Sequence, residues 1–214
     1  MTASLARQAT GPLLAFLLST ACASAGGSPP ASNGPTGGMA GGHPYTTADV
    51  VFMQNMILHH EQALEMSWLA PDRTDQEEIL LLARRIERSQ GDEIAVMERW
   101  LDARGYERPE ADHLMHHHDH HGHHAHQEHG GLMAGMLTSA QLDELAAAEG
   151  REFDRIFLEL MIYHHEGALD MVDALFAAPG SAQDPELFEF ASHVNSDQRI
   201  EITRMYQLLR AGDG

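Results

Sequence analysis

Histidine and methionine are the abundant side chains of this chain that could bind a soft metal ion. The sequence holds 16 His and 12 Met but a single Cys among 214 residues. One cysteine cannot form a disulfide within the chain or a site built from several thiolates. Imidazole nitrogen and thioether sulfur are the donors that remain, and together they favour copper or silver over calcium or magnesium. The spacing of these donors therefore decides whether a metal site is predicted.

Four of the histidines form two adjacent pairs inside an internal repeat. Residues 49–66 read DVVFMQNMILHHEQALEM and residues 154–171 read DRIFLELMIYHHEGALDM, with ten of eighteen positions identical. A second pair of segments follows, in which residues 90–97 and 198–205 share the pattern Gln-x-x-Glu-Ile-x-x-Met. Two copies of one helical hairpin are therefore predicted.

The periodicity of the apolar residues places these motifs on four long helices. Thr46 or Thr47 suits the N-cap of the first helix, and Asp184 before Pro185 suits that of the last. The expected helices run from about residue 47 to Pro71, from about Thr74 to Arg104, from Thr138 or Ser139 through Phe176, and from about Pro185 to Gly212. This pattern favours an all-α, antiparallel four-helix bundle over residues 45–212, with hairpins at 45–105 and 138–212 and essentially no strand.

Polar side chains lie on the inward faces of these helices. His59 and His60 are about 100° apart around a helix, so both can point into the bundle, and the same holds for His164 and His165. A bound metal, or mutual Glu–His hydrogen bonds, would satisfy them there. The candidate inner ligands are Met56, His59, His60, Met66, Glu93, Met97, Met161, His164, His165, Met171, Glu201 and Met205. Gln90 and Gln198 share the inward faces, whereas Glu61 and Glu166 project away from them.

Other interpretations of these residues stay open. Methionine at helical spacing is ordinary core packing, and a His that faces a Glu can be no more than a hydrogen-bonded pair. A ferritin-like di-iron centre needs Glu-x-x-His on two helices, and none stands at the inward positions here. The donors are shifted toward His and Met, which favours Cu(I) at the inner sites.

A histidine-rich segment separates the two hairpins, within a linker over residues 106–137. Its ten histidines are His113, His116, His117, His118, His120, His121, His123, His124, His126 and His129. Such a composition cannot build a core, so a disordered linker is expected. Its neutral imidazoles would bind Cu(II) or Zn(II), unless the segment is only a solvated spacer.

The N-terminal residues 1–22 resemble an export signal. Residues 11–18 are apolar but too short to span a bilayer, and residues 18–22 resemble a bacterial lipobox that ends at Cys22. Cleavage near Ala23 or Ala25 is the alternative to lipidation of Cys22. Residues 23–44 are rich in Gly, Pro and Ser, which predicts a flexible tether. An exported periplasmic or cell-surface lipoprotein is expected, with no membrane contact except its lipid anchor.

The paired motifs Asp-x-x-Phe-x-x-x-Met-Ile-x-His-His-x-x-Ala-x-x-Met and Gln-x-x-Glu-Ile-x-x-Met resemble the domain-of-unknown-function 305 family, which includes CopM-like periplasmic copper-binding proteins. The resemblance covers about residues 45–210. It implies a ferritin-like four-helix bundle, export from the cytoplasm, and copper or silver bound by His and Met. The histidine-rich insert is not part of the family motif.

Three functions are compatible with these patterns. The first is an exported copper or silver buffer, store or metallochaperone for metal homeostasis or resistance, with a copper-accepting or copper-exporting protein as partner. The second is a bundle metalloenzyme with redox activity at Glu93 and Glu201, but no catalytic constellation is visible, so a non-enzyme is expected. The third is a structural bundle without metal. A net charge of −19 disfavours nucleic acid as a partner.

Overall fold

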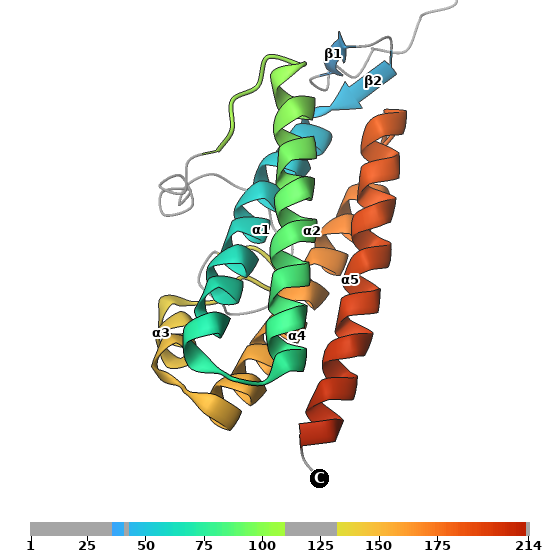
Figure 1. The fold of residues 1–214 in the computed structure, drawn as a ribbon. Helices are drawn as coiled ribbons and strands as arrows, with labels where there is room; N and C mark the ends of the chain where they lie inside the picture. Colours follow the sequence, from blue (N-terminus) through green and yellow to red (C-terminus); the bar gives the residue numbers. More distant parts are fainter. Residues whose placement is uncertain (1–35, 41–42, 110–131, 213–214) are drawn as a thin grey trace, which may run out of the picture. The chain divides into compact units, whose positions relative to one another are not determined.

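A computed structural model describes residues 36–40, 43–109 and 132–212 of the chain. Within these ranges the chain forms a two-stranded antiparallel hairpin and five helices (Figure 1). The elements are β1 (Thr36–Ala40), β2 (His43–Thr46), α1 (Thr47–Arg73), α2 (Glu77–Asp102), α3 (Ser139–Ala147), α4 (Gly150–Ala177) and α5 (Pro185–Gly212). The predicted export signal with Cys22 lies outside the described residues, as do the ten histidines between 113 and 129.

The four long helices form the predicted bundle from two hairpins. α1 packs along α2, α4 packs along α5, and the two hairpins meet where α1 lies against α4 (Figure 1). α2 and α5 face each other across a groove on another side of the bundle. The predicted all-α bundle of two duplicated hairpins is therefore confirmed.

A polar layer divides the core into two hydrophobic clusters. On α1 the first cluster takes Phe52 and Met56 and the second takes Ala63 and Met66, with the histidine pair between them. The order is reversed on α4, where the equivalent residues belong to the opposite clusters. The duplication thus builds two related apolar ends and brings the polar residues of all four helices to the same level.

The start of α1 is fixed by a capping box at Thr46. The Thr46 hydroxyl accepts a hydrogen bond from the Asp49 backbone N–H at 3.3 Å, and the Asp49 carboxylate accepts from the Thr46 backbone N–H at 2.7 Å. This confirms Thr46, one of the two predicted caps. Asp184 is confirmed as the cap of α5, because its carboxylate accepts from the backbone N–H groups of Glu186 and Leu187.

Loss of the Thr46 cap is expected to lower the free energy of unfolding by about 1 kcal/mol in Thr46→Ala, because the backbone N–H of Asp49 loses the hydroxyl that accepts its hydrogen bond. Urea denaturation followed by far-UV circular dichroism measures this change. Thr47→Ala is the matched control, since Thr47 is exposed and makes no cap. An equal loss in both variants would contradict the assignment of the cap to Thr46.

The fold differs from the sequence prediction in three places. β1 and β2 pair in a region where no strand was expected, and they lie largely in the predicted tether. The third predicted helix is two helices, because Ala148 and Glu149 are extended and α3 turns to pack against α1 and α4. α1 continues past Pro71 to Arg73, because only one backbone hydrogen bond is lost at a proline near the helix end.

No helix within the described ranges is both long and apolar enough to cross a membrane.

Candidate metal site

The four repeat histidines form a buried layer where α1 meets α4. His59, His60, His164 and His165 are each no more than 1% exposed. The rings of His59 and His164 lie face to face, with centroids 3.8 Å apart and planes tilted by 35°. Each of the two stands next to its own sequence neighbour, with ring centroids 6.5 Å apart in the first pair and 6.2 Å in the second. The duplication therefore assembles the two pairs into one cluster.

The outer histidine of each pair contacts a carboxylate from the neighbouring helix of its own hairpin. His60 Nε2 lies 2.6 Å from Glu93 Oε2, and His165 Nε2 lies 2.7 Å from Glu201 Oε2. Both glutamates were predicted on the inward faces, and the contacts place them there. Glu61 and Glu166 lie outside the layer, where Glu61 pairs with Arg108 and Glu166 accepts a hydrogen bond from the Tyr206 hydroxyl.

A backbone segment that sequence reasoning missed covers His59. The carbonyl oxygen of Ala134 lies 3.1 Å from His59 Nε2. Gln62 on α1 holds the same segment by two hydrogen bonds, from the Leu137 N–H to its Oε1 at 2.7 Å and from its Nε2 to the Leu137 carbonyl at 3.1 Å. Residues 132–137 were predicted as part of a disordered linker, but Gly135, Met136 and Leu137 are buried against the bundle.

Two glycines allow this segment to approach α4. Gly135 has φ +74°, and a Cβ built on it would lie 2.7 Å from both the Gly167 Cα and the His164 carbonyl oxygen. A Cβ on Gly167 would lie 2.3 Å from the Ala134 carbonyl oxygen. Gly167 occupies the repeat position of Gln62, so the exchange of Gln for Gly within an otherwise similar motif was the available sequence signal.

The other ring nitrogens of the layer are buried without hydrogen-bond partners among the described residues. Since a carbonyl oxygen only accepts hydrogen bonds, Nε2 of His59 carries the proton and Nδ1 keeps its lone pair. Among the described residues, the buried side-chain atoms of the layer without a hydrogen-bond partner are His59 Nδ1, His60 Nδ1, His164 Nδ1 and Nε2, His165 Nδ1, Gln90 Nε2 and Oε1, and Gln198 Oε1. Buried polar atoms of this kind need a water or an ion.

The protein environment keeps the central histidines neutral. The pKa of His59 falls from 6.5 to about 3, first because burial penalises the charged ring and then because His60 and His165 are close, while the hydrogen bond to Ala134 opposes the shift. Burial and the neighbouring histidines also hold the pKa of His164 well below its usual range. Neutral imidazole is the form that binds metal, so these rings are ready to act as ligands at neutral pH.

The predicted methionine ligands divide between the two hydrophobic clusters. Met56, Met97 and Met171 pack in the first cluster, whereas Met66, Met161 and Met205 pack in the second. Met56 and Met66 flank the same histidine pair in the sequence, but ten residues of helix separate them by about 15 Å along its axis. Each side of the histidine layer therefore has thioethers from three helices. The two methionines that flank each histidine pair in the sequence lie on opposite sides of the layer.

The described residues do not hold three or more His, Cys, Asp or Glu side chains around a single metal position. A complete site in this part of the chain therefore needs a thioether sulfur, an amide oxygen or a rotation of an imidazole. Two or three ligands are common for Cu(I), which prefers soft sulfur and imidazole donors. The predicted ligands between His113 and His129 lie outside the described residues.

Comparison with known proteins places this arrangement in a family. A family model described as "Domain of unknown function (DUF305)" matches residues 49–209. A DUF305 protein from Streptomyces coelicolor, described as secreted, is 29% identical with a TM-score of 0.62, over 78% of this chain and 94% of that one. A DUF305 fragment from Deinococcus radiodurans is 29% identical with a TM-score of 0.63, over 78% and 98%.

A third similar structure carries a metal. CopM in its Cu(I)-bound form is 27% identical to this chain with a TM-score of 0.56, over 78% of this chain and 98% of that one. CopM structures in Cu(II)-bound and silver-bound forms are also similar. No sequence among curated proteins matches this chain.

Proposed function

Since the chain belongs to the DUF305 family, we propose that it is an exported protein that binds copper, or silver, in the histidine layer of its bundle. In this role it buffers, stores or hands over the metal outside the cytoplasm. The four histidines of the layer are at most 1% exposed, so an ion can be enclosed there but a larger substrate cannot reach the rings. Binding is therefore favoured over redox catalysis.

The main support for this proposal is the hydrogen bonding of three of the four histidine rings in the layer. His59, His60 and His165 each place Nε2 against a carbonyl or carboxylate oxygen, and each leaves Nδ1 buried without a partner among the described residues. Metal-binding histidines have this arrangement, because an acceptor on one nitrogen fixes the ring and directs the other nitrogen at the ion. A purely structural His–Glu pair has no need to leave the second nitrogen buried and unpaired.

The donors support copper or silver over harder ions. The layer lies between two methionine-containing clusters, so thioether sulfur is present on both sides of it. CopM, which is 27% identical, has been crystallised with Cu(I) and with silver. We propose Cu(I) for the inner layer.

The remaining parts of the chain extend this proposal. The histidines at 113–129 would capture Cu(II) or Zn(II) and raise the metal concentration near the bundle. Residues 1–22 would direct export, with Cys22 as the lipid anchor and residues 23–44 as a tether. A copper-accepting or copper-exporting protein is the expected partner, and a net charge of −19 would attract cations and repel nucleic acid.

An anaerobic Cu(I) titration against a competing chelator tests the proposal. We expect tight, saturable binding that persists when residues 113–129 are replaced by Gly and Ser, and that is lost in His59→Ala/His164→Ala on that background. Asp143→Ala/Glu144→Ala is the matched control, because it removes two exposed side chains of α3 that lie outside the histidine layer and outside the groove between α2 and α5. If all binding disappears with the 113–129 segment, the inner histidines are structural and the proposal fails.

A further inference from the structure

The two His–carboxylate pairs occupy equivalent repeat positions but have different surroundings. Glu93 and Glu201 are 108 residues apart, and the same offset relates Arg85 to His193 and Ser89 to Asp197. The sequence thus puts an arginine and a serine next to one carboxylate, and a histidine and an aspartate at the matching positions near the other. The two His–carboxylate pairs are therefore alike in their own contacts and differ in the residues around each carboxylate.

Two side chains of α2 hold the Glu201 carboxylate in place, and we call this arrangement the lock. Arg85 Nε donates to Glu201 Oε1 at 3.3 Å and Ser89 Oγ donates to the same oxygen at 3.4 Å, while His165 contacts the other oxygen. The Glu201 side chain is only 2% exposed. Both of its oxygens are thus occupied, and the guanidinium stands between this carboxylate and solvent.

Glu93 is more open. Its side chain is 14% exposed, and His60 holds Oε2. It lines a cavity of about 850 Å³ between α2 and α5, where His193 and Asp197 also contribute to the wall. This carboxylate therefore borders the cavity on one side and contacts the histidine layer on the other.

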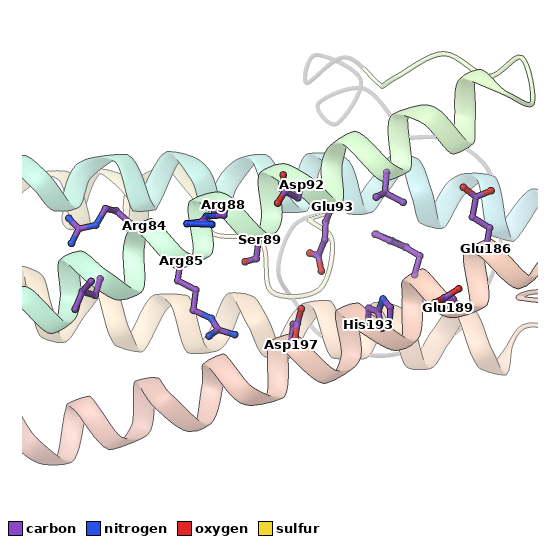
Figure 2. A pocket seen from close by; sticks show the side chains of 13 residues that line it. Arg84, Arg85, Arg88, Ser89, Asp92, Glu93, Glu186, Glu189, His193 and Asp197 are labelled. Carbon is purple, nitrogen blue, oxygen red and sulfur yellow. The ribbon is translucent and has the colours of Figure 1, made fainter.

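The charges along the groove differ from one end to the other. Figure 2 shows Arg84, Arg85 and Arg88 toward one end, and carboxylates around Glu93 and toward the opposite end. A second cavity, beside Glu201, is lined by Arg85, Arg199 and Arg204. The cavity beside Glu201 has three guanidinium groups and one carboxylate besides Glu201, that of Glu78. The cavity beside Glu93 has its three guanidinium groups toward one end, and four carboxylates besides Glu93 line it.

We propose that the Glu93 side of this groove is the port through which the metal cation reaches and leaves the histidine layer, and that Arg85 closes the equivalent route at Glu201. This inference rests on the proposed function. Carboxylates at a mouth with low-dielectric walls raise the local concentration of a cation, and a guanidinium in the same place lowers it. Uptake and release follow the same path in opposite directions, so the port controls both rates without changing how many ions are bound.

An exchange of residues between the repeats tests the port. His193→Arg/Asp197→Ser copies the Arg85 and Ser89 lock onto Glu93, and Arg85→His/Ser89→Asp removes the lock from Glu201. Each variant is made in the full chain and again with residues 113–129 replaced by Gly and Ser. Cu(I) release to excess bicinchoninate is followed by absorbance, at chelator concentrations where the rate no longer depends on the chelator.

Release of Cu(I) from the bundle is expected to slow by about ten-fold or more in the locked variant, His193→Arg/Asp197→Ser. It should rise by up to about two-fold in the unlocked variant, because two parallel routes would then operate. Asp143→Ser/Ala147→Arg is the matched control for His193→Arg/Asp197→Ser. Each of these double variants removes one aspartate and adds one arginine four residues away, and the control does so on exposed positions of α3. Thermal melting of the metal-free variants verifies that all of them fold.

Equilibrium titration with Cu(I) distinguishes a failure of the port proposal from a failure of the copper-binding proposal. Unchanged stoichiometry with the expected order of release rates supports the port. Unchanged stoichiometry with equal rates in all variants overturns the port and leaves copper binding intact. Absence of Cu(I) binding in the unmodified chain overturns the proposed function, and the port with it.

Discussion

Gly167→Ala is expected to lower the free energy of unfolding by about 3 kcal/mol or more, because the added methyl group meets backbone that cannot rotate away. A Cβ at this position would lie 2.3 Å from the Ala134 carbonyl oxygen and from the Gly135 Cα. Only a shift of the 132–137 segment or of α4 relieves the overlap. Such a shift would also break the contact between Ala134 and His59. Urea denaturation of the metal-free protein measures the loss of stability.

Gly91→Ala is the matched control for this prediction. Gly91 lies within α2, and a Cβ there would meet nothing within 4 Å. Alanine is the better helix former, so this variant should be more stable by about 0.5–1 kcal/mol. Similar stabilities of Gly167→Ala and Gly91→Ala would show that the segment does not pack against α4 in solution.

Acidification from pH 7 to pH 5 is expected to destabilise the metal-free protein through its buried histidines. The pKa of His59 is about 3 in the folded protein and about 6.5 in the unfolded chain. Between these values the unfolded chain binds a proton that the folded protein does not, so stability is lost as the pH falls. His59 alone contributes a loss of about 2 kcal/mol over this range. The pKa of His164 is lowered in the same direction and adds to the loss.

Denaturant unfolding at several pH values, with a chelator to remove metal, measures this dependence. In His59→Gln/His164→Gln the dependence should be much weaker, because glutamine does not titrate yet can still donate a hydrogen bond to the Ala134 carbonyl. His193→Gln controls for the loss of an exposed histidine and should behave as the unmodified protein. An unchanged pH dependence in the double variant would contradict the neutral, buried state of the two rings.

The sequence was sufficient for the features that depend on local pattern and on duplication. Helical periodicity predicted four long helices and the inward faces that carry His59, His60 and Glu93, and the structure buries or half-buries all three. Thr46 and Asp184 were identified as caps because capping is a contact between near neighbours. The expected continuous third helix was wrong, because the turn at Ala148 depends on how α3 packs against α1 and α4.

The duplication by itself determined that this chain is a helical bundle with histidines inside it, because the period of a helix fixes which side chains share a face. The tertiary structure decided which partners those side chains meet. Antiparallel packing of the two hairpins put Met56 in one cluster with Met171 and Met66 in the other with Met161. Tertiary packing also brought Ala134 to His59 and Arg85 to Glu201 across 75 and 116 residues of sequence. Contacts of this range arise from the packing of whole elements, and no local pattern encodes them.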